Sequence, residues 1–194
     1  MRLKFICAGL FLSVALPAFS QVAPSASQGG IPLSVGVAYS NYYTDWSGYE
    51  SGPTAWVDWT FHRGPRLLNG LGIEAEGRDL NYARTGSQPL LREDTAEGGP
   101  MYHWRHFDRF EPYGKFLFGY GHIAFNDIYN PYYTHDSRTV IAPGGGAEYR
   151  VVRNVWVRAD YEYQFWTDFF NHHALNPEGF TVGASYDLSH AHSQ

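Results

Sequence analysis

The sequence predicts an all-β protein, an antiparallel up-and-down transmembrane β-barrel of about eight strands. The first indication is an alternation, from Val155 onward, of apolar or aromatic residues with mostly charged or polar ones in the segment "NVWVRADYEYQFW", residues 154–166, which is the two-residue period of a β-strand. The second is that no apolar stretch after Leu16 is long enough for a spanning helix. The third is an aromatic content of 18%, with 15 Tyr, because aromatic rings collect at membrane interfaces. A membrane chain without apolar helices must cross as a closed barrel.

The segment 154–166 also indicates which face of the sheet meets lipid. Its apolar face is about nine residues long and, at about 3.3 Å per residue and a tilt of about 40°, covers about 23 Å. A transmembrane barrel has an apolar band of about 25 Å, so we assign the apolar face to lipid and the charged face to the lumen. In a soluble barrel the assignment would be reversed. The residues expected to face the membrane are Val155, Val157, Ala159, Tyr161, Tyr163, Val182, Ala184 and Tyr186.

The N-terminus predicts export. Residues 1–20 combine Arg2 and Lys4 with an apolar run and small residues before a cut near Ser20, the pattern of a cleaved signal peptide. The apolar run is shorter than the roughly 20 residues of a membrane span. Cys7, the only cysteine, lies inside this segment, so no disulfide is expected in the mature protein. Residues 21–31 predict a flexible lead.

The net charge and the chain length limit the possible protein class and the number of domains. Cleavage removes two basic residues and no acid, which takes the formal net charge from −5 to −7. A nucleic-acid-binding protein needs a basic face, so the negative charge argues against that class. The mature length suits one domain, which we place at residues 32–188, followed by a tail at 189–194.

Turn chemistry divides the domain into eight expected strands. Their ranges are 33–44, 54–62, 70–82, 92–104, 111–124, 139–149, 155–166 and 179–188. The fourth has the weakest pattern, since its apolar face is short and it contains a proline. The connections 63–69, 105–110 and 150–154 are short and Arg-rich, whereas 45–53, 83–91, 125–138 and 167–178 are longer. Short turns on one side and longer loops on the other are typical of outer-membrane barrels with both termini in the periplasm.

Aromatic residues near the strand ends predict two interfacial rings. On the loop side we expect Tyr161, Tyr163, Phe165 and Trp166, and similar aromatic ends occur at Tyr42, Tyr43 and Trp46 and at Tyr102, Trp104, Phe107 and Phe110. On the turn side we expect Tyr149 and Trp156.

Two stretches, "FEPYGKFLFGYGHIAF" (110–125) and "VIAPGGGAEYRVVRNVWVRADYEYQFW" (140–166), resemble the OmpA/OmpX-like outer membrane β-barrel family. The shared features are a Pro-Tyr opening a glycine-rich strand, a Gly-x-Gly-x-Glu-Tyr strand, a tight Arg/Asn turn and a Tyr-x-Tyr strand. The closing "TVGASYDL" (181–188) is similar to an assembly signal, except that residues 189–194 follow it. The resemblance implies an eight-stranded barrel and at most a narrow, gated path; such motifs specify fold better than function.

The expected inner face carries many charges, and an ionised group in a confined interior must be paired. We therefore predict a lumen ion-pair network in which Lys115 and Arg158 each bridge several carboxylates. Its expected members are Glu74, Glu76, Arg78, Lys115, Glu148, Arg158, Asp160 and Glu162. Because acids outnumber bases, any conduction would favour cations.

Other candidate sites are weaker. The "PGGG" run, 143–146, lacks the Lys-Ser/Thr and the helix of a phosphate-binding loop. His172-His173 and His190-x-His192 lack a third ligand, so no metal and no cofactor are expected. A hydrolase acting on lipid A at the rim would need a Ser, a His and an acid, and the contiguous trio His135, Asp136 and Ser137 has poor geometry for this.

The sequence thus predicts a non-enzymatic integral outer-membrane barrel with a structural or surface-interaction role and a lumen closed by ion pairs. The alternatives are a small cation-leaning channel, a lipid A-modifying rim hydrolase and a soluble lipocalin-like binder. Expected partners are outer-membrane lipid and lipopolysaccharide, the barrel-assembly machinery through the C-terminal strand, and an unidentified partner at the loops. A monomer is expected.

Overall fold

The computed structural model describes residues 32–44, 48–61, 68–85, 88–106, 109–125, 134–169 and 173–188, with the backbone alone at the strand ends within 83–89 and 168–174. The predicted signal peptide (1–20), lead (21–31) and tail (189–194) lie outside the described residues and remain predictions. Among the described residues, no helix has the length and apolar character needed to cross a membrane.

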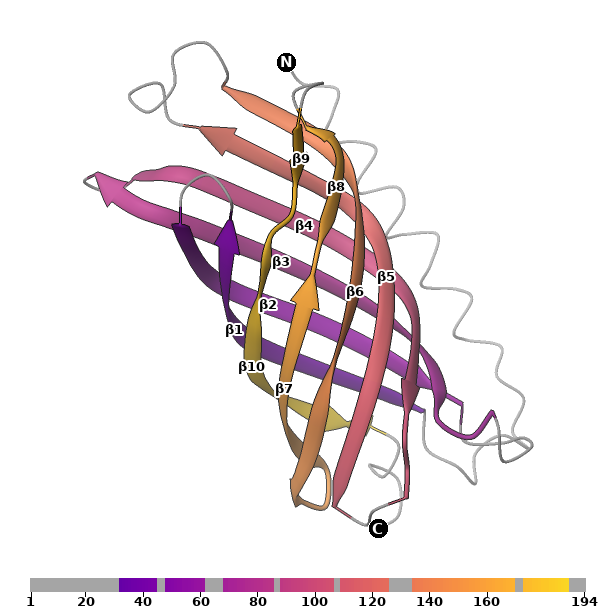
Figure 1. The fold of residues 1–194 in the computed structure, drawn as a ribbon. Coiled ribbons are helices and arrows are strands. Elements are labelled where there is room, and N and C mark those ends of the chain that lie inside the picture. The colour runs from indigo at the N-terminus through magenta and orange to yellow at the C-terminus, as the bar shows by residue number, and fades with distance from the viewer. Residues whose placement is uncertain are drawn as a thin grey trace, which may run out of the picture. The chain divides into compact units, whose positions relative to one another are not determined.

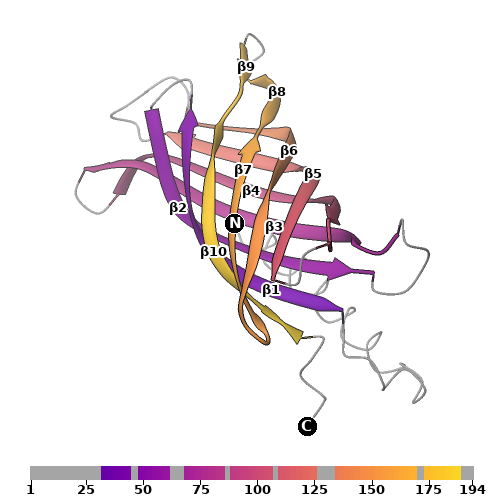
Figure 2. The ribbon, with the colours of Figure 1, turned by 60° about the horizontal axis from the view of Figure 1, so that its bottom comes forward.

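The chain forms a closed antiparallel barrel (Figure 1). Its strands are β1 (Leu33–Thr44), β2 (Gly48–Thr60), β3 (Leu71–Thr85), β4 (Gln88–His103), β5 (Phe110–Phe125), β6 (His135–Val152), β7 (Val155–Tyr163), β8 (Phe165–Phe169), β9 (His173–Leu175) and β10 (Glu178–Asp187). Each strand pairs with the next along the chain from β1 to β7, and β10 closes the ring between β7 and β1. Figure 2 shows β10 in this position.

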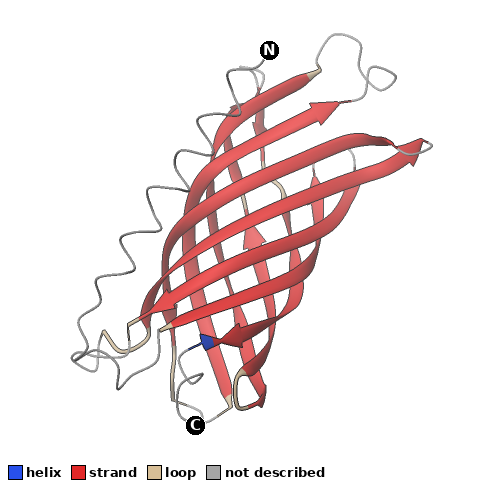
Figure 3. Ribbon diagram, turned by 180° about the vertical axis from the view of Figure 1, so that it is seen from behind, coloured by secondary structure: helices blue, strands red, loops and turns tan. Residues whose placement is uncertain are grey.

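Two of the ten segments continue their neighbours. β8 follows β7 after Gln164, and β9 precedes β10, so β7–β8 and β9–β10 are two long strands with a short interruption in each. The barrel therefore has eight strands, which confirms the predicted fold class. Seen from behind, strands make up nearly all of the described chain (Figure 3).

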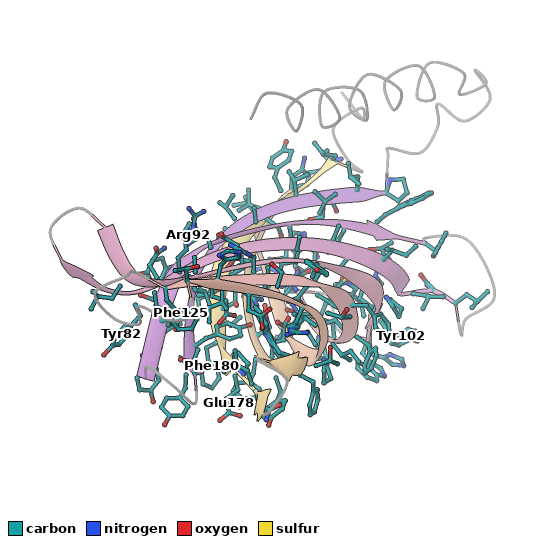
Figure 4. All side chains as sticks on the ribbon, turned by 90° about the horizontal axis from the view of Figure 1, so that it is seen from above. Tyr82, Arg92, Tyr102, Phe125, Glu178 and Phe180 are labelled. Carbon is teal, nitrogen blue, oxygen red and sulfur yellow. The ribbon has the colours of Figure 1, made fainter. Side chains whose placement is uncertain are left out.

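The two-residue period sets which side chains lie inside. In β7, Trp156, Arg158, Asp160 and Glu162 are buried while the residues between them are exposed or half-buried. β2 alternates in the same way over its whole length. Figure 4, viewed from above, shows side chains with nitrogen and oxygen atoms inside the ring of strands, and the labelled Arg92 and Phe180 on its outer side. The polar residues line the lumen, as expected for a barrel that meets lipid outside.

We call the end at which β1 begins and β10 ends the terminal end, and the opposite end the distal end. At the terminal end β3 is preceded by a tight turn in which Leu71 N donates to Leu68 O at 3.1 Å. Gly70 in this turn has φ +116°, a conformation that L side chains avoid. At the same end Arg153 and Asn154 form the β6–β7 turn.

The strands are longer at the distal end than the sequence predicted. β2 begins at Gly48, the β3–β4 hairpin extends to Thr85 and Gln88, and β6 begins at His135; these positions lie in the expected loops 45–53, 83–91 and 125–138. The last three residues of β8 and all of β9 lie within the expected loop 167–178. The apolar pattern ends where the membrane would end, but the antiparallel ladder continues beyond it because its backbone hydrogen bonds do not depend on an apolar face.

The fourth strand is regular although its sequence pattern was the weakest. β4 pairs with β3 in one register from Leu71↔Tyr102 to Thr85↔Gln88. The middle of its inner face is polar, with Glu93, Thr95 and Glu97 buried between Leu91 and Met101. A membrane barrel needs no apolar core at such positions.

Candidate functional site in the barrel lumen

Lys115 on β5 is the centre of a buried ion-pair network in the lumen. Its Nζ lies 2.7 Å from Glu76 Oε2, 3.0 Å from Glu74 Oε1 and 3.0 Å from Glu162 Oε2. Asp160 Oδ1 is 3.6 Å away. The four carboxylates come from β3 on one side and β7 on the other, so one ammonium joins two walls of the barrel.

Arg158 on β7 is a second centre. Its guanidinium contacts Glu74 Oε2 at 2.7 Å, Asp160 Oδ2 at 3.0 Å and Asp58 Oδ2 at 3.5 Å. The same guanidinium lies 4.6 Å from the ring centroids of Trp56 and Tyr113. Stacking on two aromatic faces adds a cation–π attraction and fixes the plane of the guanidinium. The predicted bridging roles of Lys115 and Arg158 are therefore present in the structure.

Arg78 on β3 is a third centre, which the sequence did not distinguish from the other members. It contacts Glu76 and, at 3.0 Å, Glu162 Oε1. Its guanidinium lies 4.3 Å from the ring centroid of Tyr42, whose hydroxyl donates to Glu162 Oε1 at 3.3 Å. Three cations thus share one connected set of carboxylates, which is the arrangement that a buried charge requires.

Glu148 is the predicted member that lies apart from this set. It is buried on β6 and stands opposite Arg158 in the β6–β7 register. Its Oε2 lies 4.0 Å from His103 Nδ1, a pair that is ionic only when the imidazole is protonated. Arg158 is therefore the register neighbour of Glu148 but not its ionic partner. Its guanidinium contacts Asp58, Glu74 and Asp160 instead.

Several lumen residues complete the network without having been predicted as members. Tyr113 Oη donates to Asp160 Oδ2 at 2.9 Å. Asp58 lies on the inner face of β2, but its contact with Arg158 could be inferred only with knowledge of the register. Further buried acids lie toward the distal end: Glu50, Glu93 and Glu97. All of these residues occupy strand positions whose side chains point into the lumen, and this two-residue alternation was the signal that could have identified them.

Gln164 connects the network to an apolar layer. Its Nε2 donates to Glu97 Oε1 at 3.1 Å and to Glu162 Oε1 at 3.0 Å, while its Oε1 accepts a hydrogen bond from Trp166 Nε1 at 2.9 Å. Trp166 belongs to a distal apolar cluster consisting of Leu91, Leu117, Ile123, Phe125, Val140, Ala142, Trp166 and Leu175. The described lumen therefore contains a charged layer and, toward the distal end, an apolar one.

The placement of Tyr42, Trp156 and Trp166 shows that three of the ring predictions were wrong. Their exposed fractions are 0%, 9% and 1%, and each lies on the inner parity of its strand. Aromatic composition near a strand end did not distinguish an interfacial ring from a lumen side chain. Other members are at the outer surface: Tyr43, Tyr149, Tyr161 and Phe165 are exposed and Tyr163 is half-buried.

The residues predicted to face the membrane lie on the outer side. Val157, Ala159, Tyr161, Val182, Ala184 and Tyr186 are exposed, and Val155 and Tyr163 are half-buried. Outer rings pack against each other, as Tyr161 does against Phe180 with centroids 4.9 Å apart. The outer face of β7, and that of β10 from Phe180 to Tyr186, is thus apolar and aromatic, with Glu178 at its distal edge.

The distal rim holds a Ser–His contact that the sequence had not predicted. Ser137 Oγ lies 2.7 Å from His122 Nδ1, across the β5–β6 pair rather than beside His135. Asp136 accepts from Ser137 N and Arg138 Nε. Asp94 stands opposite His122 in the β4–β5 register but pairs with Arg92. Among the described residues no acid contacts His122, so the third member of a hydrolase triad is missing here.

The metal hypotheses receive no support from the described residues. No group of three or more His, Cys, Asp or Glu side chains in that part of the chain is placed to hold a metal ion. His172, His190 and His192 lie outside the described residues, and of His173 only the backbone is described.

A closed eight-stranded barrel with an apolar outside and a charged, filled inside defines the class of small outer-membrane β-barrels. The sequence matches the outer membrane protein beta-barrel domain over residues 9–187. The chain belongs to this family, and the protein is located in the outer membrane, within its lipid and lipopolysaccharide.

Solved structures show the same fold at low identity. Neisserial surface protein A (NspA) has a TM-score of 0.63 and 12% identity, covering 82% of this chain and 99% of that one. Ail, the attachment invasion locus protein of Yersinia pestis, has a TM-score of 0.56 and 18% identity in its complex with the heparin analogue sucrose octasulfate, covering 81% and 97%. OprG from Pseudomonas aeruginosa has a TM-score of 0.50 and 10% identity, covering 79% and 94%. No curated protein matches the sequence.

Proposed function

We propose that this protein is a non-conducting, non-enzymatic barrel of the outer membrane that acts through its envelope-spanning wall and its distal surface. The observation that carries this proposal is the filled lumen. Lys115, Arg78 and Arg158 are at most 4% exposed, and their ion pairs join opposite walls of the barrel. An eight-stranded barrel has an interior only wide enough for side chains, so a lumen crossed by these contacts has no continuous water path.

The energetic argument supports closure as well. Moving Lys115 aside would leave four carboxylates together in a low-dielectric interior. Truncation of one partner of a buried ion pair costs about 3–5 kcal/mol. Thermal opening of this network would therefore be rare.

The distal end supports a surface role. The β3–β4 hairpin extends to Thr85 and Gln88, and the outer face of these strands carries polar residues, among them Asp79, Arg92 and Asp94. A polar outer face suits strands that rise above the hydrocarbon layer. The similar structures include a surface protein and an attachment protein, in agreement with contact through this end; the partner is unidentified.

Assembly and orientation complete the proposal. β10 is the last strand and closes the barrel against β1, which suits recognition by the barrel-assembly machinery during insertion. We assign the terminal end to the periplasm and the distal end to the cell exterior, with the protein as a monomer. Residues 1–20 direct export in this scheme.

Planar-bilayer recording tests the closed lumen. We expect the purified wild-type protein to give no single-channel steps. Cation-selective steps that disappear in Lys115→Glu or Arg158→Glu, but persist in the outer-surface variant Arg92→Glu, would instead establish the small cation channel.

A second measurement tests the absence of enzymatic activity. Purified protein incubated with lipopolysaccharide should release no fatty acid. If fatty acid is released by the wild type and not by Ser137→Ala, the rim hydrolase is the correct function and the Ser137–His122 contact is its centre.

A further inference from the structure

The terminal end of the lumen contains a cavity of about 140 Å³. It is lined by the ends of the strands and by four carboxylates: Asp58, Glu111, Glu148 and Asp187. The cationic lining residues are Arg105 and Arg150, and His103 lies beside them. Acids thus outnumber permanent cations on the walls of this cavity.

Each of the two arginines contacts another side chain. Arg105 Nε lies 3.5 Å from Glu111 Oε2. The guanidinium of Arg150 lies 5.6 Å from the ring centroid of Trp156. Arg105 is thus paired with Glu111, and Arg150 lies against Trp156.

Asp58 and Glu148 remain poorly compensated. They are 3% and 7% exposed. Asp58 Oδ2 lies 3.5 Å from Arg158, which binds Glu74 and Asp160 more closely, and the Asp58 carboxyl shares a side-chain hydrogen bond with Glu74, a second acid. Glu148 Oε1 has no hydrogen-bond partner among the described residues. A buried carboxylate needs a counter-charge, and here both face a cavity that has room for one.

We propose that this cavity binds a partly hydrated divalent cation, Mg²⁺ or Ca²⁺, through Asp58 and Glu148. Carboxylate oxygens are the ligands of hard cations, and Mg²⁺ commonly binds through one or two carboxylates while keeping several waters. A cavity of about 140 Å³ has room for such waters. Partial hydration also agrees with the lack of a preformed three-residue metal centre in the described chain.

The site extends the lumen network toward the terminal end. Asp58 lies in both, because it contacts Arg158 on one side and lines the cavity on the other. The cation would stabilise the open end of the barrel, where the ion-pair network itself is absent. This inference does not depend on the closed lumen or on the surface role.

Terbium luminescence provides the test, because Trp156 lines the cavity and its indole can transfer excitation to bound Tb³⁺. Protein refolded in non-ionic detergent without lipopolysaccharide is titrated with Tb³⁺. We expect saturable sensitised emission at one ion per barrel, displaced by Ca²⁺ or Mg²⁺. Asp58→Asn and Glu148→Gln should each weaken binding at least tenfold, and Trp156→Phe should lower the emission.

Matched controls separate this site from other acids. Glu93→Gln changes a buried carboxylate that does not line the cavity and should leave the Tb³⁺ midpoint unchanged. Heat-modifiable gel mobility must show that each variant is folded, and calcium calorimetry on Trp156→Phe must show retained binding. Emission that is absent in the folded wild type, or unaffected by Asp58→Asn and Glu148→Gln, would overturn the proposal.

Discussion

Among single residues, Lys115 has the position most sensitive to substitution. Its ammonium contacts carboxylates of two strands on opposite sides of the lumen. Lys115→Met keeps much of the side-chain volume but leaves these buried carboxylates without their shared cation. We expect a loss of about 3–5 kcal/mol in the free energy of unfolding, measured by urea unfolding in lipid vesicles through tryptophan fluorescence.

Arg92→Met is the control for this substitution. Arg92 also bridges two carboxylates, Asp79 and Asp94, but at the outer surface with a side chain 49% exposed. Exposed ion pairs contribute about 0–1 kcal/mol, so we expect a change within that range. Equal losses in the two variants would mean that the Lys115 contacts are not desolvated in the folded protein.

Gly121 allows a second test at this scale. A Cβ at Gly121 would collide with the indole of Trp166, whereas a Cβ at Gly77 has only Thr95 O nearby, at 3.9 Å. Overpacking a filled interior costs about 1–3 kcal/mol. We expect Gly121→Ala to lower the midpoint of urea unfolding and Gly77→Ala to leave it nearly unchanged. A neutral Gly121→Ala would show that the distal apolar cluster repacks freely.

The lumen partners show what could and could not be predicted for individual residues. The two-residue alternation along a strand is enough to assign Glu74, Arg158 or Asp160 to the inner face from sequence alone. It does not say which of them meet, because contacts across the lumen depend on the shear between strands distant in sequence. The same limit explains Tyr42: its parity was inward, but its aromatic character suggested the membrane interface.

At the scale of strands, apolar alternation predicted the membrane part of each element and missed its extension. β1 has the predicted bounds, 33–44, because outward and inward side chains alternate along its length. β6 is longer at both ends than 139–149, because beyond the lipid a strand needs only its hydrogen-bonded neighbours. The interruption at Gln164 was also not predictable: Gln164 N donates to Pro177 O at 2.7 Å, a contact set by the β9–β10 segment.

The strand ends give a test of orientation. The chain has one cysteine, in the expected signal peptide, so introduced cysteines are unique after cleavage. His135 and Arg153, at opposite ends of β6 and both exposed, are a matched pair. With a membrane-impermeant maleimide on intact cells, we expect His135→Cys to be labelled and Arg153→Cys to be labelled only after the outer membrane is permeabilised. The reverse pattern would invert the proposed orientation.

For the whole molecule, the decisive question is whether the outer face of the barrel meets lipid or water. Ala159 is exposed at the centre of β7, and Thr139 is exposed near the distal end of β6. An arginine on the lipid face costs about 2–4 kcal/mol at the bilayer midplane and about 0–1 kcal/mol near the interface. In lipid vesicles we therefore expect Ala159→Arg to be destabilised by about 2–4 kcal/mol and Thr139→Arg by no more than about 1 kcal/mol. Both positions face outward, so lumen chemistry does not contribute to the difference. If both variants unfold at the wild-type urea midpoint, the outer face meets water, and the charged interior would have to be explained without a membrane.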